Sequence, residues 1–176
     1  MNLGWKLAAA VHGRAPEGLL DSYHEERHLI GANVLEWSRA QVAIMKPCPH
    51  ARALRSVITD LINTKNGATY MASRISGVNL HYNLGDAHPL IGYSAPDFEL
   101  EDGTKIHSQM RDAQTILLDF RGCDTLKNLE NEYGQMRYVF SHAKDELGLG
   151  ALLIRPDGFV AWACNGEPDE QEVRKA

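Results

Sequence analysis

Thr115-Ile-Leu-Leu-Asp-Phe120 is the most informative stretch of the chain for its architecture. Apart from Thr115 and Asp119 the run is apolar, so both of its faces suit a protein interior. It has the length of a buried strand and is too short for a core helix. We therefore predict a central strand over 115–120, preceded by a short strand and turn over 98–103.

The segments after this run alternate between helical and strand-like patterns. Residues 125–136 have a helical pattern, and residues 137–140 form a second short apolar run. Two further strand-like runs, 151–154 and 159–163, flank Arg155-Pro-Asp-Gly158, whose residue types favour a tight turn. Strand, helix, strand and hairpin in this order predict an α/β domain.

The first residues of the chain predict a helix. Leu3, Leu7 and Val11 share one helical face, and Gly13 is suited to end the helix in a left-handed conformation. The expected cover for this apolar stripe lies outside the chain. We therefore expect the helix either to fray or to pair with a second copy in a homodimer.

Three more helices are expected before the α/β domain. The first is long, with Pro16 in its first turn and Pro47 after its end, and the others cover about 51–63 and 68–75. Their apolar residues recur at helical spacing, so this part of the chain contributes no strand to the predicted sheet.

The pattern changes after Gly77, where residues 78–82 alternate as a short strand and glycine and proline then interrupt the chain. We predict a helical segment over 1–77, a strand and linker over 78–92, and the α/β domain over 93–176.

The composition is that of a globular protein of 176 residues, 44% hydrophobic and 23% charged, with a net charge of −5. Its mixed charges include no basic block, so nucleic acid is not expected as a partner. No apolar stretch reaches the length of a membrane span or resembles a signal peptide, so no membrane association is expected. Three widely spaced cysteines do not describe a disulfide framework, and the expected compartment is the cytoplasm.

Two stretches resemble a known family. Asn2-Leu-Gly-Trp-Lys-Leu-Ala8 and Leu19-Leu-Asp-Ser-Tyr23 resemble the end of the flavin-binding region in aromatic hydroxylases of the para-hydroxybenzoate hydroxylase type. Gly92-x-x-Ala95-Pro-Asp-Phe98 and the segment from Leu152 to Trp162 resemble the thioredoxin-like domain that ends one branch of that family. His88-Pro-Leu90 is similar to a segment of the family members that hydroxylate angucycline polyketides.

The resemblance covers essentially the whole chain and implies a helical N-terminal segment followed by a thioredoxin-like α/β domain. In such enzymes FAD is reduced by NADPH, and one oxygen atom is transferred to a small aromatic substrate. The resemblance also places Asn2 and Leu3 near the flavin, at a helix amino end that favours negative charge on the reduced ring. The helices between about 29 and 75 would belong to the substrate-side scaffold.

The parts of the family that hold FAD are not found in this sequence. Gly148-Leu-Gly150 precedes an expected strand, so it does not match the Gly-x-Gly-x-x-Gly loop that opens a helix at the pyrophosphate. The family's loop before Asn2 is missing as well. We therefore expect no FAD on this chain alone and hypothesise a truncated reading frame or a gene remnant.

Cys123 is the redox candidate of the chain. It follows the 115–120 run at an expected helix start, where thioredoxins carry Cys-x-x-Cys and a helix amino end favours a thiolate. The second cysteine is replaced by Leu126, and Phe120 stands where peroxiredoxins have the threonine of Thr-x-x-Cys. The predicted domain therefore lacks the redox pair.

Other reactive side chains predict no site. Cys48 and His50 form a single potential ligand pair without a second pair at zinc spacing, so no metal is expected. His81 and His88 have no nucleophile or carboxylate pair beside them. No catalytic residue is assigned in this chain.

The expected function is that of the carboxy-terminal fragment of an FAD-dependent monooxygenase acting on aromatic or polyketide substrates, not catalytic alone. Two alternatives stay open. One is a stand-alone thioredoxin-like or peroxiredoxin-like redox protein that uses Cys123, and the other is a non-catalytic interaction module supporting a separately encoded flavin domain.

Overall fold

The computed structural model describes residues 1–85 and 87–175. The chain divides into two compact units. The first joins Met1–Leu20 to His81–Ala176 and contains the sheet, and it is called the α/β unit below. The second, Asp21–Leu80, is the helical unit.

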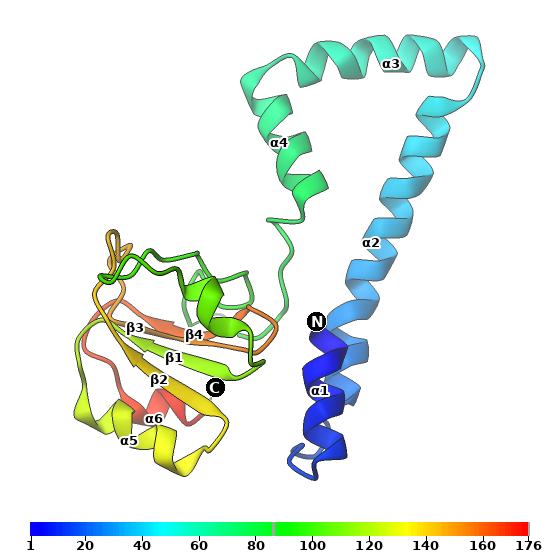
Figure 1. Cartoon of the computed structure of the whole chain (residues 1–176). Helices are drawn as coiled ribbons and strands as arrows, with labels where there is room; N and C mark the ends of the chain where they lie inside the picture. The colour runs from blue at the N-terminus through cyan, green and yellow to red at the C-terminus, as the bar shows by residue number, and fades with distance from the viewer. Residues whose placement is uncertain (86, 176) are drawn as a thin grey trace. The chain divides into compact units, whose positions relative to one another are not determined.

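A four-stranded sheet forms the centre of the α/β unit (Figure 1). Its strands are β1 (Thr115–Asp119), β2 (Met136–Phe140), β3 (Ala151–Ile154) and β4 (Val160–Cys164), in the order β2-β1-β3-β4. β1 pairs in parallel with β2 and antiparallel with β3, which pairs antiparallel with β4. β1 is an interior strand, so the expected central strand and the α/β class are confirmed.

Two helices cover one face of the sheet, α5 (Asp124–Glu132) and α6 (Glu170–Val173). Leu129 of α5 packs in one buried cluster with Leu117 of β1 and Trp162 of β4. Alternate residues of a strand point to opposite faces of the sheet, so the residues on either side of Leu117 in β1 pack on the other face.

The opposite face is covered by the chain that precedes β1. Phe98 and the short 3-10 helix η1 (Ile106–Met110) pack against Ile116 of β1. The strand expected within 98–103 is reduced to isolated bridges, one of which joins Glu99 to Lys105.

Arg155-Pro-Asp-Gly158 forms the expected hairpin turn between β3 and β4. Gly158 has a φ of 89°, and its N–H donates to the carbonyl of Arg155 at 2.9 Å. β4 begins at Val160, one residue later than expected. The ring of Phe159 instead lies 4.3 Å from the ring of Tyr82, measured between centroids.

Four helices lie in the first half of the chain: α1 (Asn2–Val11), α2 (Asp21–Met45), α3 (Pro49–Ile62) and α4 (Lys65–Ser76). These bounds confirm the helical first half. Pro16 lies in the turn before α2 rather than in its first helical turn, which corrects that expectation.

The strand expected over 78–82 is wrong. Gly77 ends α4 with a φ of 74°, and the N–H of Leu80 donates to the Gly77 carbonyl at 2.9 Å. The chain therefore turns here. The next backbone hydrogen bond to a distant segment is made by Tyr82, whose N–H donates to the Gly92 carbonyl at 2.9 Å.

α1 groups with the α/β unit, whereas the division expected from the sequence placed it in the helical segment. Its buried residues are Asn2 and Lys6. Leu3, Leu7 and Val11 are 38%, 44% and 82% exposed. The packed face of α1 therefore carries Asn2 and Lys6 together with the partly buried Trp5, and the stripe of Leu3, Leu7 and Val11 is the outer face.

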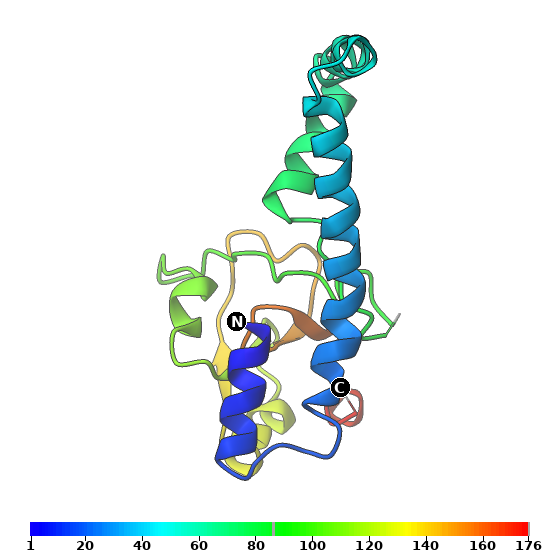
Figure 2. The same ribbon diagram turned by 90° about the vertical axis from the view of Figure 1, so that its right-hand side faces the viewer.

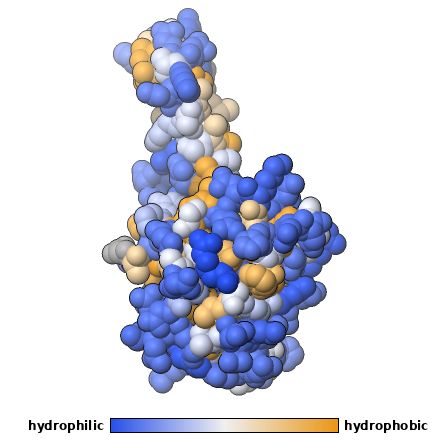
Figure 3. Space-filling model, turned by 90° about the vertical axis from the view of Figure 1, so that its left-hand side faces the viewer, coloured by the Kyte–Doolittle hydropathy of each residue, from blue (hydrophilic) through white to orange (hydrophobic). Residues whose placement is uncertain are grey.

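The helical unit has almost no interior of its own, since Ala51 is its one buried residue. Figure 2 shows α2 as a single unbroken helix. Leu35 and Val42 of α2 and Val57 of α3 are exposed, and hydrophobic side chains are visible between hydrophilic ones in Figure 3. Within the described residues, no helix combines the length and the hydropathy needed to cross a membrane.

Candidate functional site

The amino end of α1 is attached to the β3–β4 turn. The side-chain amide of Asn2 donates to Oδ2 of Asp157 at 3.0 Å, and Asn2 is 7% exposed. Leu3, the next residue, is directed outward. The structure therefore separates the two residues expected near a flavin, one turned into the α/β unit and one toward solvent.

Charged and aromatic side chains surround this attachment. Arg155 donates to both carboxylate oxygens of Asp157, from Nε at 3.2 Å and from Nη2 at 2.9 Å. Its guanidinium carbon lies 5.2 Å from the ring centroid of Trp5 and 5.6 Å from that of Tyr82. An arginine that stacks on rings and pairs with a buried carboxylate holds its neighbours in one geometry. The α/β unit thus fixes how α1 begins.

The described residues supply only part of what FAD requires. The Asn2 side chain is engaged with Asp157, and the α1 N-cap, Met1, makes no side-chain capping hydrogen bond. A helix amino end attracts negative charge, but it does not replace a loop of backbone amides around a pyrophosphate. Asn2 and the amino end of α1 therefore offer a flavin little beyond one electropositive helix end.

The second candidate, Cys123, lies at the predicted position, as the N-cap of α5. Asp119, which is fully buried, holds the loop before it by accepting the backbone N–H groups of Arg121, Gly122 and Cys123 at 2.7, 3.1 and 2.6 Å. The Cys123 Sγ lies 3.1 Å from Oγ1 of Thr125.

Tyr138 completes this cluster by donating its hydroxyl to Oδ2 of Asp119 at 2.8 Å. Burial, together with that carboxylate, raises the pKa of the Tyr138 hydroxyl. The carboxylate of Asp119 thus accepts four hydrogen bonds and acts as the organiser of the β1–α5 loop.

The other cysteines have structural surroundings. The Sγ of Cys48 accepts the N–H of Ala51 at 3.5 Å and caps α3. Burial raises the pKa of the Cys164 thiol, whose Sγ lies 3.7 Å from the Gly166 carbonyl. Across the described residues, no group of three or more His, Cys, Asp or Glu side chains is arranged to hold a metal.

His81 and His88 serve the connection that precedes the sheet. Nε2 of His81 lies 3.1 Å from the Ile91 carbonyl. His88 accepts the N–H of Leu90 at Nδ1, and its Nε2 lies 2.9 Å from Oδ1 of Asn165. Both rings therefore fix loops.

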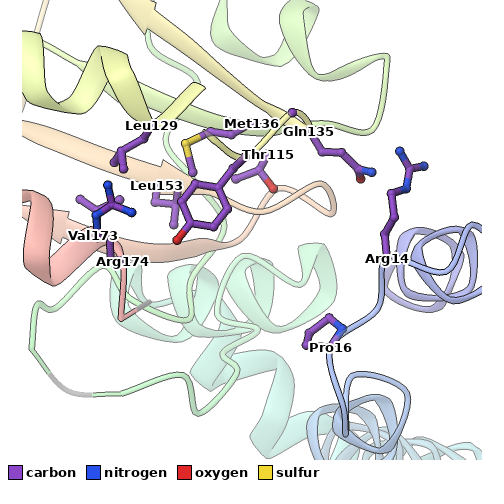
Figure 4. A pocket seen from close by; sticks show the side chains of 11 residues that line it. Arg14, Pro16, Thr115, Leu129, Gln135, Met136, Leu153, Val173 and Arg174 are labelled. Carbon is purple, nitrogen blue, oxygen red and sulfur yellow. The ribbon is translucent and has the colours of Figure 1, made fainter. Parts of the chain in front are cut away.

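A pocket of about 520 Å³ lies at the end of the sheet where β1 and β2 begin (Figure 4). Apolar side chains of α5, β2, β3 and α6 line one side, and Arg14 approaches from the connection between α1 and α2. Figure 4 shows its guanidinium directed toward Gln135. No sequence pattern pointed to this pocket, because its residues are dispersed along the chain.

Two family models match the chain. The model of the aromatic-ring hydroxylase C-terminal domain matches residues 88–176, and a model of an FAD-binding domain matches residues 1–38. The first covers the α/β unit from His88 onward, and the second covers α1 and part of α2.

Known proteins resemble the chain along almost its whole length. A protein from Claviceps purpurea described as a monooxygenase is 41% identical over 169 residues, which are 94% of this chain and 33% of that protein. Among solved structures, the OxyS anhydrotetracycline hydroxylase from Streptomyces rimosus has a TM-score of 0.90 at 33% identity, covering 99% of this chain and 38% of that one. CabE, an aromatic hydroxylase from angucycline biosynthesis, has a TM-score of 0.85 at 34% identity, covering 97% and 37%.

The chain therefore spans about a third of the length of the relatives that it matches.

Proposed function

This chain belongs to the aromatic-ring hydroxylase family, and from that membership we propose that it forms the carboxy-terminal part of an FAD-dependent monooxygenase. The whole enzyme would hydroxylate an aromatic or polyketide small molecule with NADPH as the reductant. The chain alone would not be catalytic. Its proposed location is the cytoplasm, without nucleic acid or a membrane as partner.

The observation that carries this proposal is the combination of two matches in one chain. An FAD-binding domain model ends within α2, and the hydroxylase-specific model begins near the sheet. Either match alone would leave the reaction open, because FAD serves many reactions. Together they support a flavin-dependent hydroxylation.

FAD, when bound in such an enzyme, supplies the oxygen chemistry. The proposed task of the α/β unit is to hold α1 in a fixed orientation. Asp157 and Arg155 fix the face of the helix that carries Asn2, so its apolar face, with Leu3 and Leu7, is presented away from the α/β unit. That outer face is the proposed contact with the flavin-binding part of the enzyme.

A chimaera tests the proposal. In the Streptomyces rimosus hydroxylase, the matching carboxy-terminal part would be replaced by this chain, and the upstream part made alone is the control. We expect the chimaera to retain FAD and to hydroxylate anhydrotetracycline with NADPH. A folded, monodisperse chimaera that holds no FAD would contradict the proposal.

A second candidate function is an interaction module that supports a separately encoded flavin domain. The exposed apolar side chains of α1 and of the helical unit favour it, since such faces mark interaction sites. Mixing this chain with the separately made upstream part tests whether the two can act as separate chains. Co-elution with flavin in the complex favours the module, and a complex without flavin counts against it.

A further inference from the structure

The pocket at the start of β1 and β2 has an apolar side built from distant parts of the chain. Leu129, Leu153 and Val173 line it from α5, β3 and α6, and all three are buried side chains of one cluster. Met136 adds a flexible thioether at the start of β2. The volume of about 520 Å³ is within the range of small-molecule sites, about 300–1,000 Å³.

A cation stands at the open end of this pocket. The guanidinium of Arg14 faces the side-chain amide of Gln135, and the amide oxygen is the atom that suits it as acceptor. The amide is neutral, and among the residues that the structure describes no carboxylate pairs with Arg14. Arg174, on the same pocket, differs, because it pairs with Glu132 at 2.7 Å and with Glu170 at 2.6 Å.

A second hollow of about 540 Å³ adjoins the first and shares Arg14 and Gln135 with it. Trp5 lines this hollow, and its indole N–H is buried and has no acceptor among the described residues. Asp112 lines the same hollow and would repel an anion placed beyond Arg14.

We propose that this pocket binds a small aromatic carboxylate, with its ring against the apolar side and its carboxylate on Arg14. Guanidinium and carboxylate match in bidentate geometry, and the aromatic residue Tyr133 also lines the pocket. With Arg174 already paired to Glu132 and Glu170, the charge that Arg14 offers suits a monoanion better than a phosphate dianion. The site is separate from the proposed flavin contact of α1, so it stands or falls independently of the proposed function.

Titration of the purified full chain with 2-naphthoate and with its neutral analogue 2-naphthamide, followed by NMR, tests this proposal. We expect 2-naphthoate to bind with a Kd of about 1 mM or tighter and to shift the amides of Gln135 and Met136. Arg14→Gln should weaken 2-naphthoate by about tenfold, and Arg14→Lys by less, because lysine keeps the charge but loses the bidentate geometry. Arg52→Gln, on the exposed surface of α3, is the matched control and should leave affinity unchanged.

The comparison of 2-naphthoate with 2-naphthamide uses the wild-type chain, so it does not depend on the folding of any variant. Equal affinities for 2-naphthoate and 2-naphthamide would overturn the proposal, as would unchanged 2-naphthoate affinity in Arg14→Gln. Absence of saturable binding, or shifts confined to the helical unit, would overturn it as well.

Discussion

The side-chain amide of Asn2 donates to the Asp157 carboxylate at 3.0 Å, so the first residue of α1 is tied to a turn 155 residues later in the chain. Asp157 is nearly inaccessible, at 1% side-chain exposure, and also pairs with Arg155. This contact explains why α1 packs with the α/β unit through the face that carries Asn2.

Asp157→Ala should therefore detach α1 and destabilise the α/β unit. Removing one partner of a buried ion pair leaves an uncompensated charge and costs about 3–5 kcal/mol. Urea unfolding of the variant measures the loss, with Asp145→Ala on an exposed loop as control. A change below about 1 kcal/mol would show that the attachment of α1 does not depend on this carboxylate.

The outer face of α1 leads to a prediction about local stability. Leaving a side chain such as Leu7 or Val11 in water forgoes roughly 1.5–3 kcal/mol of burial each. We expect the amides of residues 7–11 to exchange with solvent faster than those of residues 116–118 in β1. Equal protection in a sample shown to be monomeric would contradict this, whereas protection only in a dimer would identify a second copy as the cover.

The raised pKa of Tyr138 should make the free energy of unfolding fall at alkaline pH. Burial and the Asp119 carboxylate raise the pKa of its hydroxyl above the ordinary value of about 10. The unfolded chain therefore loses this proton at a lower pH than the folded chain. The contribution of the Tyr138 hydroxyl to the free energy of unfolding is therefore full below about pH 10, and it diminishes as the pH rises above that value.

Absorbance titration of tyrosinate measures this shift directly. One of the six tyrosines should ionise later than the others, and Tyr138→Phe should remove that late step. Late ionisation that persists in Tyr138→Phe would assign it to another residue and contradict the prediction.

Cys123 provides a prediction about chemistry. Its loop is organised by Asp119, and Leu126 stands in place of a second thiol. Because position 126 carries no second thiol, the loop has no dithiol pair, and we expect peroxide consumption by the chain to be negligible and unchanged in Cys123→Ser. Consumption that disappears in Cys123→Ser would instead support the redox alternative.

The sequence predicted the elements of the α/β unit well, because the apolar run of β1 and the turn residues at 155–158 are local signals. It did not predict which face of α1 is packed. A stripe of leucine and valine is ordinarily the inner face of a helix, and Asp157, the partner of Asn2, lies far away in the sequence. The strand expected over 78–82 failed for a related reason, since alternation without a neighbouring strand does not make a sheet.

The candidate site was less predictable than the fold. Cys123 could be placed at a helix start from its neighbours, but the hydrogen bonds of Asp119 and the approach of Arg14 to Gln135 depend on tertiary structure. Asp119 did leave one signal, a single carboxylate in an otherwise apolar run. A charge in a buried strand needs hydrogen-bond partners, and the β1–α5 loop and Tyr138 supply them.

The flavin content of the purified chain after gel filtration in the presence of FAD tests the central claim most directly. A micromolar complex needs about 8 kcal/mol of binding free energy, whereas a helix amino end offers a negative group about 0.3–1 kcal/mol. We expect the chain alone to elute colourless, because it supplies only α1 and the α/β unit that orients this helix. Yellow protein with stoichiometric FAD would contradict the account.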